Sequence, residues 1–418
     1  MLLRACSSAW PPLGSAALGP ESSGGPPRPL PPRPWPRVVP LLRVLEHQDG
    51  DRQGGAANVM SSTRSVLIVG NFLSAAGGSR GVCEELADRL PALGWRVLTT
   101  SNRRPKLFRL ADMIRTVVKC RHDYAIAQVD VFSGPAFFWA EAAGFALRGL
   151  HKPCVLTLHG GNLPAFAARR PGRARRLLSS ADIVTAPSAY LATSLQPCCG
   201  HIRVIPNPVE IASYPCRERI AVQPKLMWLR AFHEIYNPVM AVKVAAALVQ
   251  DFPALTLAMA GPDKGDGSFQ QTRAEAAAAG LNGRIRFLGQ VDKREVPRVL
   301  AEADIFLNTA RMDNTPVSVI EAMACGLCVV STNVGGIPCL VRHGQEALLV
   351  PPDDARSMTG AVRRLLEPGV LCGALSRNAR TAACAFDSPR VMASWNDLLE
   401  GLLSVKCHPP SQMMSYEG

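Results

Sequence analysis

The segment 308–352 constrains the fold of this chain more than any other. It reads NTARMDNTPVSVIEAMACGLCVVSTNVGGIPCLVRHGQEALLVPP. An apolar strand, a short polar loop, a helix rich in Ala and Met, a second apolar strand and a Gly-Gly turn follow one another, which is a βαβ unit. Loops of such units fall at the carboxyl ends of parallel strands, where open α/β sheets bind ligands. Two carboxylates, Asp313 and Glu321, flank the loop and the helix start, so the segment predicts a ligand site and favours an enzyme.

The same alternation of apolar strands and longer helical stretches runs along most of the chain. Alternation of this kind predicts parallel sheets, and two series of similar length predict two doubly wound domains. The expected strands are 65–70, 95–101, 124–130, 153–161, 181–188 and 202–208, then 225–230, 254–262, 284–291, 304–310, 328–332 and 347–352. The expected helices are 81–93, 107–119, 238–250, 270–279, 295–302, 319–324, 355–366 and 389–403.

Composition shifts suggest where the domains begin and end. With 418 residues the chain has room for two domains, each with its own core. Pro and Gly pairs crowd residues 1–59, so we expect that segment to be disordered or untranslated, with Met60 as the start; an organellar presequence is the alternative. We expect a first domain over 60–217, a second over 218–387, a helix over 388–406 that packs back on the first domain, and a disordered tail over 407–418.

The charge is basic and unevenly spread. The formal net charge is +13, and between Arg148 and Arg176 there are seven Lys or Arg residues and no acid. This segment could rest on an anionic membrane surface, and a solvated helix face is the alternative. Nucleic acid is not expected as a partner, because the basic residues are not interleaved with aromatic ones and no reader motif is present. No apolar run reaches the roughly 18–20 residues that span a bilayer, so we expect a cytoplasmic protein, peripheral at most on the inner face of the membrane.

The cysteines predict neither a metal site nor disulfides. There are 13, an odd number, without CxxC pairs at zinc spacing. They indicate reduced thiols in a cytosolic compartment. We expect Cys154, Cys325 and Cys328 to be buried and structural.

From about residue 65 to residue 403 the chain resembles the retaining glycosyltransferases of family 4. The motifs that carry the resemblance are, in order, GNFLSAAGGSRG, LHGGN, APS, VIPNPVE, LRAF, MAGPDKGDG, RFLGQV, DNTPVSVIEAMACGLCVVST, VGGIP and LLVPPDD. The resemblance implies the α/β GT-B fold, two Rossmann-like domains with parallel sheets that face a central cleft. It also implies a nucleotide-sugar donor held mostly by the second domain, with the acceptor on the first.

The resemblance assigns roles to three charged residues. Glu321 would bind the ribose hydroxyls, and Asp313 the hydroxyls of the transferred sugar, although the family has the longer Glu at that position. Arg230 would bind the diphosphate. The lysine that usually follows it is replaced here by HEIYNP, so Asn237 or Tyr236 would bond in its place, or Lys264 would supply the charge.

Backbone groups and glycines complete the expected site. Backbone amides at the start of a helix attract anions. Thr315, Pro316, Val317 and Ser318 form the start of the helix that contains Glu321. In the family, Gly77 and Gly78 would face the donor phosphates, His159 would lie near the transferred sugar, and backbone near Val291 would contact the base. Ser188, Asn207 and Pro208 are more typical of strand ends than of ligand contacts.

These observations favour a retaining hexosyltransferase-like enzyme of polysaccharide or glycoconjugate biosynthesis. Its partners would be a nucleotide-sugar donor and a saccharide or lipid-linked acceptor. With no Asp-x-Asp pair in the expected cleft we predict no metal and no other cofactor. Two alternatives stay open, a degenerate subunit that binds or scaffolds without catalysis, and a sugar-nucleotide epimerase.

Overall fold

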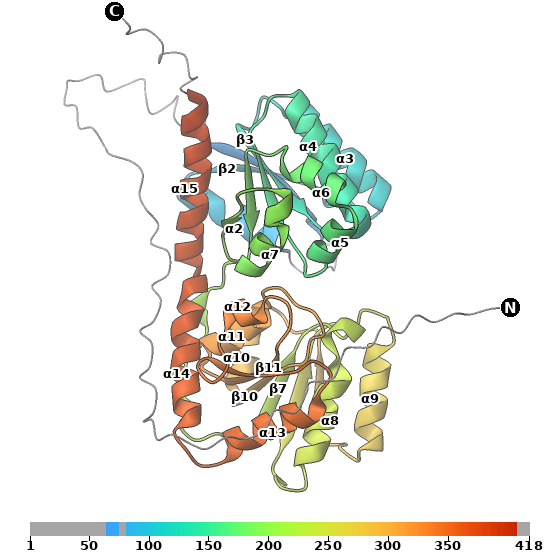
Figure 1. Cartoon of the computed structure of the whole chain (residues 1–418), viewed down its shortest axis with the longest axis vertical. Helices are drawn as coiled ribbons and strands as arrows, with labels where there is room; N and C mark the ends of the chain where they lie inside the picture. Colours follow the sequence, from blue (N-terminus) through green and yellow to red (C-terminus); the bar gives the residue numbers. More distant parts are fainter. Residues whose placement is uncertain (1–63, 75–80, 408–418) are drawn as a thin grey trace, which may run out of the picture. The chain divides into compact units, whose positions relative to one another are not determined.

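The computed structural model of the protein describes residues 64–74 and 81–407, without the side chains of 405–407. These residues belong to one compact unit and build two α/β domains (Figure 1). The predicted extension 1–59, the start at Met60, the glycines Gly77 and Gly78, and the tail from residue 408 lie outside the described residues.

The first domain is built on a six-stranded sheet whose strands are all parallel. The strand order is β2-β1-β3-β4-β5-β6, so β1 and β3 are neighbours at the point where the order changes direction. Its strands are β1 (Ser65–Val69), β2 (Arg96–Thr100), β3 (Ile126–Val131), β4 (Cys154–Leu158), β5 (Ile183–Ala186) and β6 (Arg203–Val204).

Helices cover both faces of this sheet. One group of helices, seen beside the sheet in Figure 1, buries the face of Leu67, Val129 and Leu156. That side carries α3 (Lys106–Lys119), α4 (Phe137–Gly149), α5 (Leu163–Arg169), α6 (Pro171–Leu178) and α7 (Ala189–Leu195). The opposite face, with Val66 and Ile68, is covered by α2 (Val82–Arg89) and α15 (Ser388–Cys407).

The second domain repeats the architecture with the order β12-β11-β10-β7-β8-β9. Here β7 and β10 are the central neighbours from which the chain winds outward in both directions, which is the switch point at which such sheets bind ligands. Its strands are β7 (Lys225–Leu229), β8 (Thr256–Ala260), β9 (Ile285–Gly289), β10 (Ile305–Asn308), β11 (Cys328–Thr332) and β12 (Ala347–Val350).

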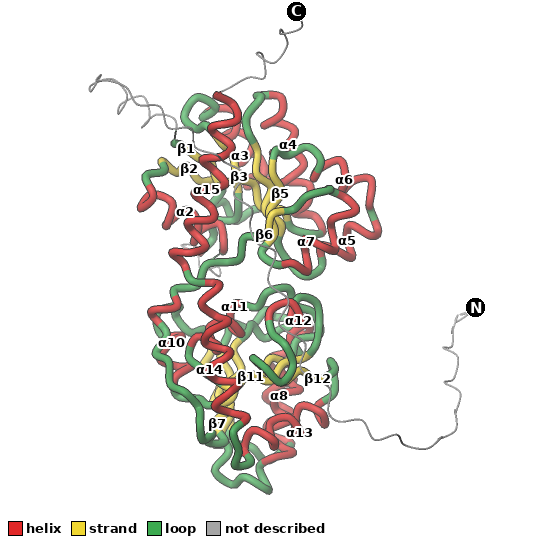
Figure 2. Tube along the Cα trace, turned by 60° about the vertical axis from the view of Figure 1, so that its left-hand side comes forward, coloured by secondary structure: helices red, strands yellow, loops and turns green. Residues whose placement is uncertain are grey.

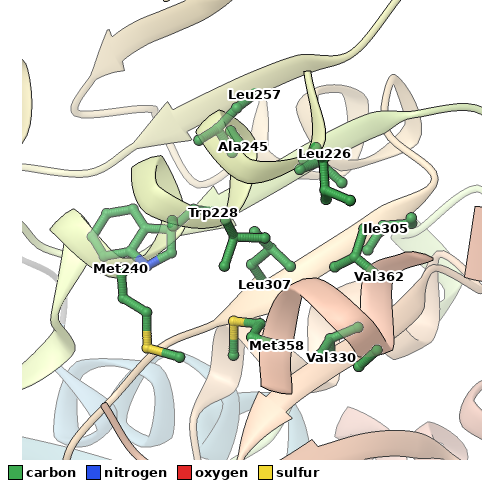
Figure 3. Packing of buried hydrophobic residues seen from close by; sticks show 14 of the residues in the cluster. Leu226, Trp228, Met240, Ala245, Leu257, Ile305, Leu307, Val330, Met358 and Val362 are labelled. Carbon is green, nitrogen blue, oxygen red and sulfur yellow. The ribbon is translucent and has the colours of Figure 1, made fainter. Parts of the chain in front are cut away.

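Alternate residues of β7 point to opposite sides of the second sheet. Leu226 and Trp228 pack with Met240 and Met358 on one side (Figure 3), where α8 (Pro238–Leu248), α9 (Ser268–Ala278) and α13 (Ala355–Leu366) lie. Helices α8 and α13 are in contact, as Figure 2 also shows. Met227 joins the other core, under α10 (Val296–Ala301), α11 (Val317–Ala324), α12 (Ile337–Leu340) and α14 (Leu371–Ala383).

The last helix, α15, starts beside the second domain and packs on the first. Trp395, Leu398 and Leu402 join the core formed by Val66 and Ile68. Trp95 Nε1 donates to Asn396 Oδ1 at 3.0 Å, and Arg89 Nε donates to Ser388 Oγ at 2.8 Å. These contacts anchor the C-terminal helix to the first domain.

The structure confirms the predicted strands and shows helices that the sequence did not predict, among them α4, α6 and α14. Cys154, Cys325 and Cys328 are buried and free, as expected. Within the described part of the chain, every helix is too short or too polar to span a membrane.

Candidate functional site

The loop between β10 and α11 is buried although it is polar. Asp313 and Asn314 are 7% exposed and Glu321 is 3% exposed. Pro316 has an extended backbone and caps α11, and its carbonyl accepts from the amide of Val319 at 3.1 Å. The amides of Val317 and Ser318 donate to no residue that the structure describes, and they stand at the positive end of the helix dipole.

Arg230 and Asp313 meet at the switch point of the second sheet. Arg230 follows β7 directly and Asp313 lies in the loop that follows β10. Arg230 Nη2 donates to both carboxylate oxygens of Asp313, at 2.9 and 2.7 Å. The guanidinium also lies 4.4 Å from the centre of the Tyr236 ring, which is a cation–π contact.

Arg230 and the loop that carries Asp313 each contain a buried polar atom that lacks a hydrogen-bond partner among the described residues. Arg230 Nε and Thr315 Oγ1 are buried without a hydrogen-bond partner among the described residues. Buried polar atoms without a partner are uncommon and call for an explanation; these two, beside the free amides of α11, could bind an anion. Burial raises the pKa of Asp313, while the charge of Arg230 acts in the opposite direction.

Two glycine positions let backbone approach the pair. A Cβ on Gly261 would lie 1.8 Å from the carbonyl oxygen of Arg230, and the φ of Gly261 is +144°. A Cβ on Gly336 would lie 2.0 Å from the carbonyl oxygen of Asn314. The amide of Gly336 donates to the carbonyl of Asp313 at 3.1 Å, so the Gly-Gly turn after β11 packs against the Asp313 loop and supports it.

Glu321 is held by two residues that the sequence did not reveal. Tyr214 Oη donates to Glu321 Oε1 at 2.7 Å, and Lys293 Nζ forms an ion pair with the same oxygen. The side chain of Lys293 is 53% exposed and that of Glu321 is 5% exposed. Burial raises the pKa of Tyr214, and the charge of Glu321 raises it further. No sequence pattern links Tyr214, in the connection between the domains, to a helix in the second domain.

His159 lies at the carboxyl end of β4 and is 6% exposed. Its Nε2 is 3.0 Å from Asp130 Oδ1, and its ring stacks on Phe132 with 4.9 Å between centres. Two residues further on, a Cβ on Gly161 would lie 3.2 Å from Met312 Cγ and 3.6 Å from the carbonyl carbon of Asp313. The loop after β4 therefore reaches the Asp313 loop of the second domain.

Ser188 provides a second contact between these domains. Its hydroxyl hydrogen-bonds Asn314 Oδ1, and it caps α7 by accepting from the amide of Leu191 at 3.2 Å. The residue that we interpreted as a strand end thus also helps to position the Asp313 loop.

Some predicted residues lie apart from this cluster or do other work. The Asn237 amide donates to Asp353 Oδ1 at 2.8 Å and so is not bonded to Arg230. Lys264 is exposed, and its backbone amide donates to Phe232. Val291 is half-buried and packs on the core under α11. Gly77 and Gly78 are outside the described residues; on either side of that gap in sequence, the amides of Ser74 and Gly81 donate to the buried Glu84 at 3.0 and 2.8 Å.

Comparison with known proteins identifies the family. Residues 76–213 match the family described as Glycosyltransferase Family 4, and residues 223–368 match Glycosyl transferases group 1. A D-inositol 3-phosphate glycosyltransferase of Acidothermus cellulolyticus is 26% identical over 305 residues, which cover 66% of each chain. The chain spans 66%, 37% and 57% of the length of three such relatives.

Solved structures support the same fold. The Anabaena protein Alr3699/HepE, solved in complex with UDP and glucose, matches with a TM-score of 0.64 and 20% identity over 81% of this chain and 100% of its own. The sucrose-phosphate synthase of Thermosynechococcus elongatus matches with a TM-score of 0.68 and 19% identity over 82% of this chain and 100% of its own. The chain therefore belongs to glycosyltransferase family 4 and has the GT-B fold, as its motifs predicted.

Proposed function

We propose that this protein transfers a sugar, with retention of configuration, from a nucleotide-sugar donor to a saccharide or lipid-linked acceptor in glycoconjugate biosynthesis. The observation that carries the proposal is the Arg230–Asp313 pair at the β7/β10 switch point, beside the free amides of Val317 and Ser318. A cation, helix-start amides and a buried carboxylate together fit a diphosphate that is linked to a sugar.

Each group has a role in this proposal. Arg230 and the amides at the start of α11 bind the diphosphate and stabilise the negative charge that grows on it as the sugar leaves, the kind of electrostatic term that contributes most in many enzymes. Asp313 accepts hydrogen bonds from sugar hydroxyls. Glu321, held by Tyr214, accepts from both ribose hydroxyls.

Lys293 takes the part that we had assigned to Lys264. Lys293 is a half-exposed cation that forms an ion pair with Glu321. Glu321 in turn lies about one helical turn beyond Val317, or roughly 6 Å along the axis of α11. A long lysine side chain at that distance can move between the carboxylate and a bound phosphate. It would compensate for the lysine that is missing after Arg230.

We expect transfer to proceed without a divalent metal, because Arg230, Lys293 and the helix start already provide positive potential at the leaving group. Activity should persist in EDTA. Complete loss in EDTA that magnesium or manganese reverses would contradict this part of the proposal.

The donor can be identified by a panel of UDP-, GDP- and ADP-sugars. We expect one nucleotide class to raise the unfolding temperature of the full chain and to be slowly hydrolysed, and both effects to disappear in Glu321→Ala. UDP-sugars should be tested first, since the Anabaena neighbour was solved with UDP. Donor binding without hydrolysis or transfer to any acceptor would instead favour a degenerate binding subunit.

The acceptor side of the proposal includes an anionic membrane surface. Neighbouring helices α3 and α4 expose large apolar side chains, with Leu107 at 81%, Phe108 at 69% and Phe145 at 74%. Exposed arginines of α5 and α6 lie on the same side of the sheet, among them Arg169, Arg175 and Arg176. Apolar side chains beside basic ones fit the headgroup region of an anionic bilayer. Arg173 is not part of this surface, because it pairs with Glu141.

Vesicle co-sedimentation tests the membrane surface. We expect the protein to bind vesicles that contain anionic phosphatidylglycerol and not neutral phosphatidylcholine vesicles. The double variant Phe108→Ser, Phe145→Ser should lose binding, whereas Val370→Ser, which removes an apolar side chain 92% exposed in the second domain, should not. Binding that is indifferent to anionic lipid would exclude this surface.

A further inference from the structure

The first domain contains a buried carboxylate–imidazole pair next to the proposed site. Asp130 lies near the carboxyl end of β3 and His159 directly follows β4, and these strands are neighbours in the sheet. Asp130 Oδ1 is 3.0 Å from His159 Nε2, with only 5% and 7% of the two side chains exposed. An ionised carboxylate can only accept, so a neutral imidazole that hydrogen-bonds to it through Nε2 must carry its hydrogen on that nitrogen.

Several neighbours fix Asp130 in place. Gln128 Nε2 donates to Asp130 Oδ1 at 2.9 Å, while Gln128 Oε1 stays buried without a donor among the described residues. A Cβ on Gly70 would come within 2.9 Å of Asp130 Oδ2 and 2.8 Å of Cys83 Sγ. Leaving the Gln128 carbonyl buried without a donor has a free-energy cost. The side chain nevertheless keeps the orientation in which its amide donates to Asp130.

The imidazole of His159 is equally constrained. Its backbone amide donates to the carbonyl of Val131 at 2.9 Å, and its ring stacks on Phe132 with 22° between the planes. The second ring nitrogen, Nδ1, bonds to no described residue. This nitrogen keeps a lone pair that can accept a hydrogen bond.

The pair lies where the first sheet would bind a ligand. The carboxyl ends of β1 and β3 form the switch point of this sheet. A small hollow opens there, lined by Asn71, Asp130, Phe132 and Trp139 among others. Asp130, the partner of His159, lines this hollow, and the loop at Gly161, two residues beyond His159, reaches the Asp313 loop of the proposed donor site.

We propose that Asp130 is a positioning residue that holds the His159 ring with Nδ1 as a hydrogen-bond acceptor for a sugar hydroxyl during transfer. The inference rests on the proposed function. Asp130 does not touch the substrate in this proposal and acts only through His159. An Asn at this position would donate to Nε2, favour the tautomer with hydrogen on Nδ1, and turn the acceptor into a donor.

The tautomer can be measured without substrate. Long-range ¹H–¹⁵N spectra of the full chain, recorded where histidine is neutral, distinguish protonated from unprotonated ring nitrogens, and His159→Gln identifies the signals among the eight histidines. We expect the wild type to carry hydrogen on Nε2 and Asp130→Asn to shift the ring toward hydrogen on Nδ1. Hydrogen on Nδ1 in the wild type, or a spectrum that Asp130→Asn leaves unchanged, would overturn the proposal.

Kinetics test whether Asp130 acts through His159. We expect Asp130→Asn to lower kcat about tenfold or more, the effect of losing one well-placed hydrogen bond, with a smaller change in donor KM. The same substitution in a His159→Ala background should have no further effect on kcat. An equal fall in both backgrounds would show that Asp130 acts independently of His159.

A matched control separates positioning from loss of folding. Asp182→Asn removes another carboxylate of the first domain, which accepts from the amide of Cys154 at 2.8 Å at the opposite end of the sheet. It should leave the His159 signals and kcat unchanged, and the unfolding temperatures of both variants should be recorded. The spectra decide the inference even if no donor is turned over, so failure of the proposed function and failure of this inference give different results.

Discussion

Arg230 Nη2 donates to both carboxylate oxygens of Asp313, at 2.9 and 2.7 Å. Arg230 directly follows β7 and Asp313 lies in the loop after β10; these are the two central strands of the second sheet. Because strand order reverses between these strands, the pair occupies the one place in this sheet where loops diverge and leave room for a ligand. The pair also sets the charge of the site, since each member offsets the other while the site is empty.

Replacing Asp313 by Asn should lower turnover with little loss of donor binding. Asn preserves the shape and leaves Arg230 available to the diphosphate, but it removes the charged acceptor for the sugar hydroxyls. We expect kcat to fall roughly 100-fold, the size seen when one stabilising group is removed from a transition state. Initial rates with the identified donor measure this. Asp353→Asn, which alters an exposed carboxylate paired with Arg311, is the control and should keep most of its activity.

Asp313 should also affect how stability depends on pH. Burial raises the pKa of Asp313 above the 3.8 of an unburied Asp. At a pH between 3.8 and the pKa of the folded state, the folded protein therefore holds a proton that the unfolded chain has lost. Its contribution to stability is full below 3.8 and is lost as the pH rises through the folded pKa.

The measurement is urea unfolding of wild type and Asp313→Asn from about pH 4 upward, with the difference in unfolding free energy plotted against pH. We expect the wild type to lose stability relative to the variant as pH rises, by at most about 1.4 kcal/mol per pH unit. A difference that stays level or grows in favour of the wild type would show that the pKa is not raised.

Tyr214→Phe should weaken nucleotide binding through Glu321. The substitution removes only the hydroxyl that donates to Glu321 Oε1 at 2.7 Å, so the carboxylate loses a partner that fixes its rotamer. We expect the Kd for a nucleoside diphosphate to rise about three- to tenfold, the effect of one ordinary hydrogen bond, because the tyrosine acts on the nucleotide only through Glu321. Calorimetry measures the Kd. Tyr190→Phe, a half-buried tyrosine of the first domain, should not change it.

Lys293→Ala should reduce affinity for nucleoside diphosphates much more than it reduces stability. The ammonium is half-exposed, so its ion pair with Glu321 adds little to stability. We expect the Kd for the diphosphate to rise about fivefold and to depend less on salt, because one cation near the phosphates is lost. Lys264→Ala serves as the matched control, and a larger effect there would restore the original assignment.

The central strands could be predicted because they are continuous apolar runs that are buried on both faces. Cys328–Thr332 is completely buried, as expected for a central parallel strand. Helix α14 could not be predicted, since its buried positions include Cys372, Leu375, Ala379 and Ala383. Cysteine and alanine are small and only weakly apolar, so the helical spacing of these residues leaves little signal in the sequence.

The site shows the same division. Arg230, Asp313 and His159 lie at or just beyond the carboxyl ends of predicted strands, so their positions at those ends of the two sheets could be inferred. Tyr214 and Lys293 contact Glu321 across 107 and 28 residues of sequence. Such contacts depend on how loops from different strands fold over α11, which local propensity and periodicity do not encode.

The Gly-Gly turn after β11 offers a purely steric prediction. Gly336 has a φ of −86°, which any residue can adopt. A Cβ there would nevertheless lie 2.0 Å from the carbonyl oxygen of Asn314 and 2.9 Å from its carbonyl carbon. These are backbone atoms and cannot rotate away, so Gly336→Ala must push the Gly335–Gly336 turn and the Asp313 loop apart.

We therefore expect Gly336→Ala to lose activity by displacing Asp313 and Asn314, and to lower the free energy of unfolding by about 1–3 kcal/mol, as overpacking does. Gly360→Ala is the control, since nothing lies within 4 Å of its Cβ in the middle of α13. It should stabilise the protein by about 0.5–1 kcal/mol through helix propensity and leave turnover unchanged. Thermal unfolding and initial rates of both variants decide the matter. If Gly336→Ala retained full activity, the contact between this turn and the Asp313 loop would not be needed to hold Asp313 for transfer.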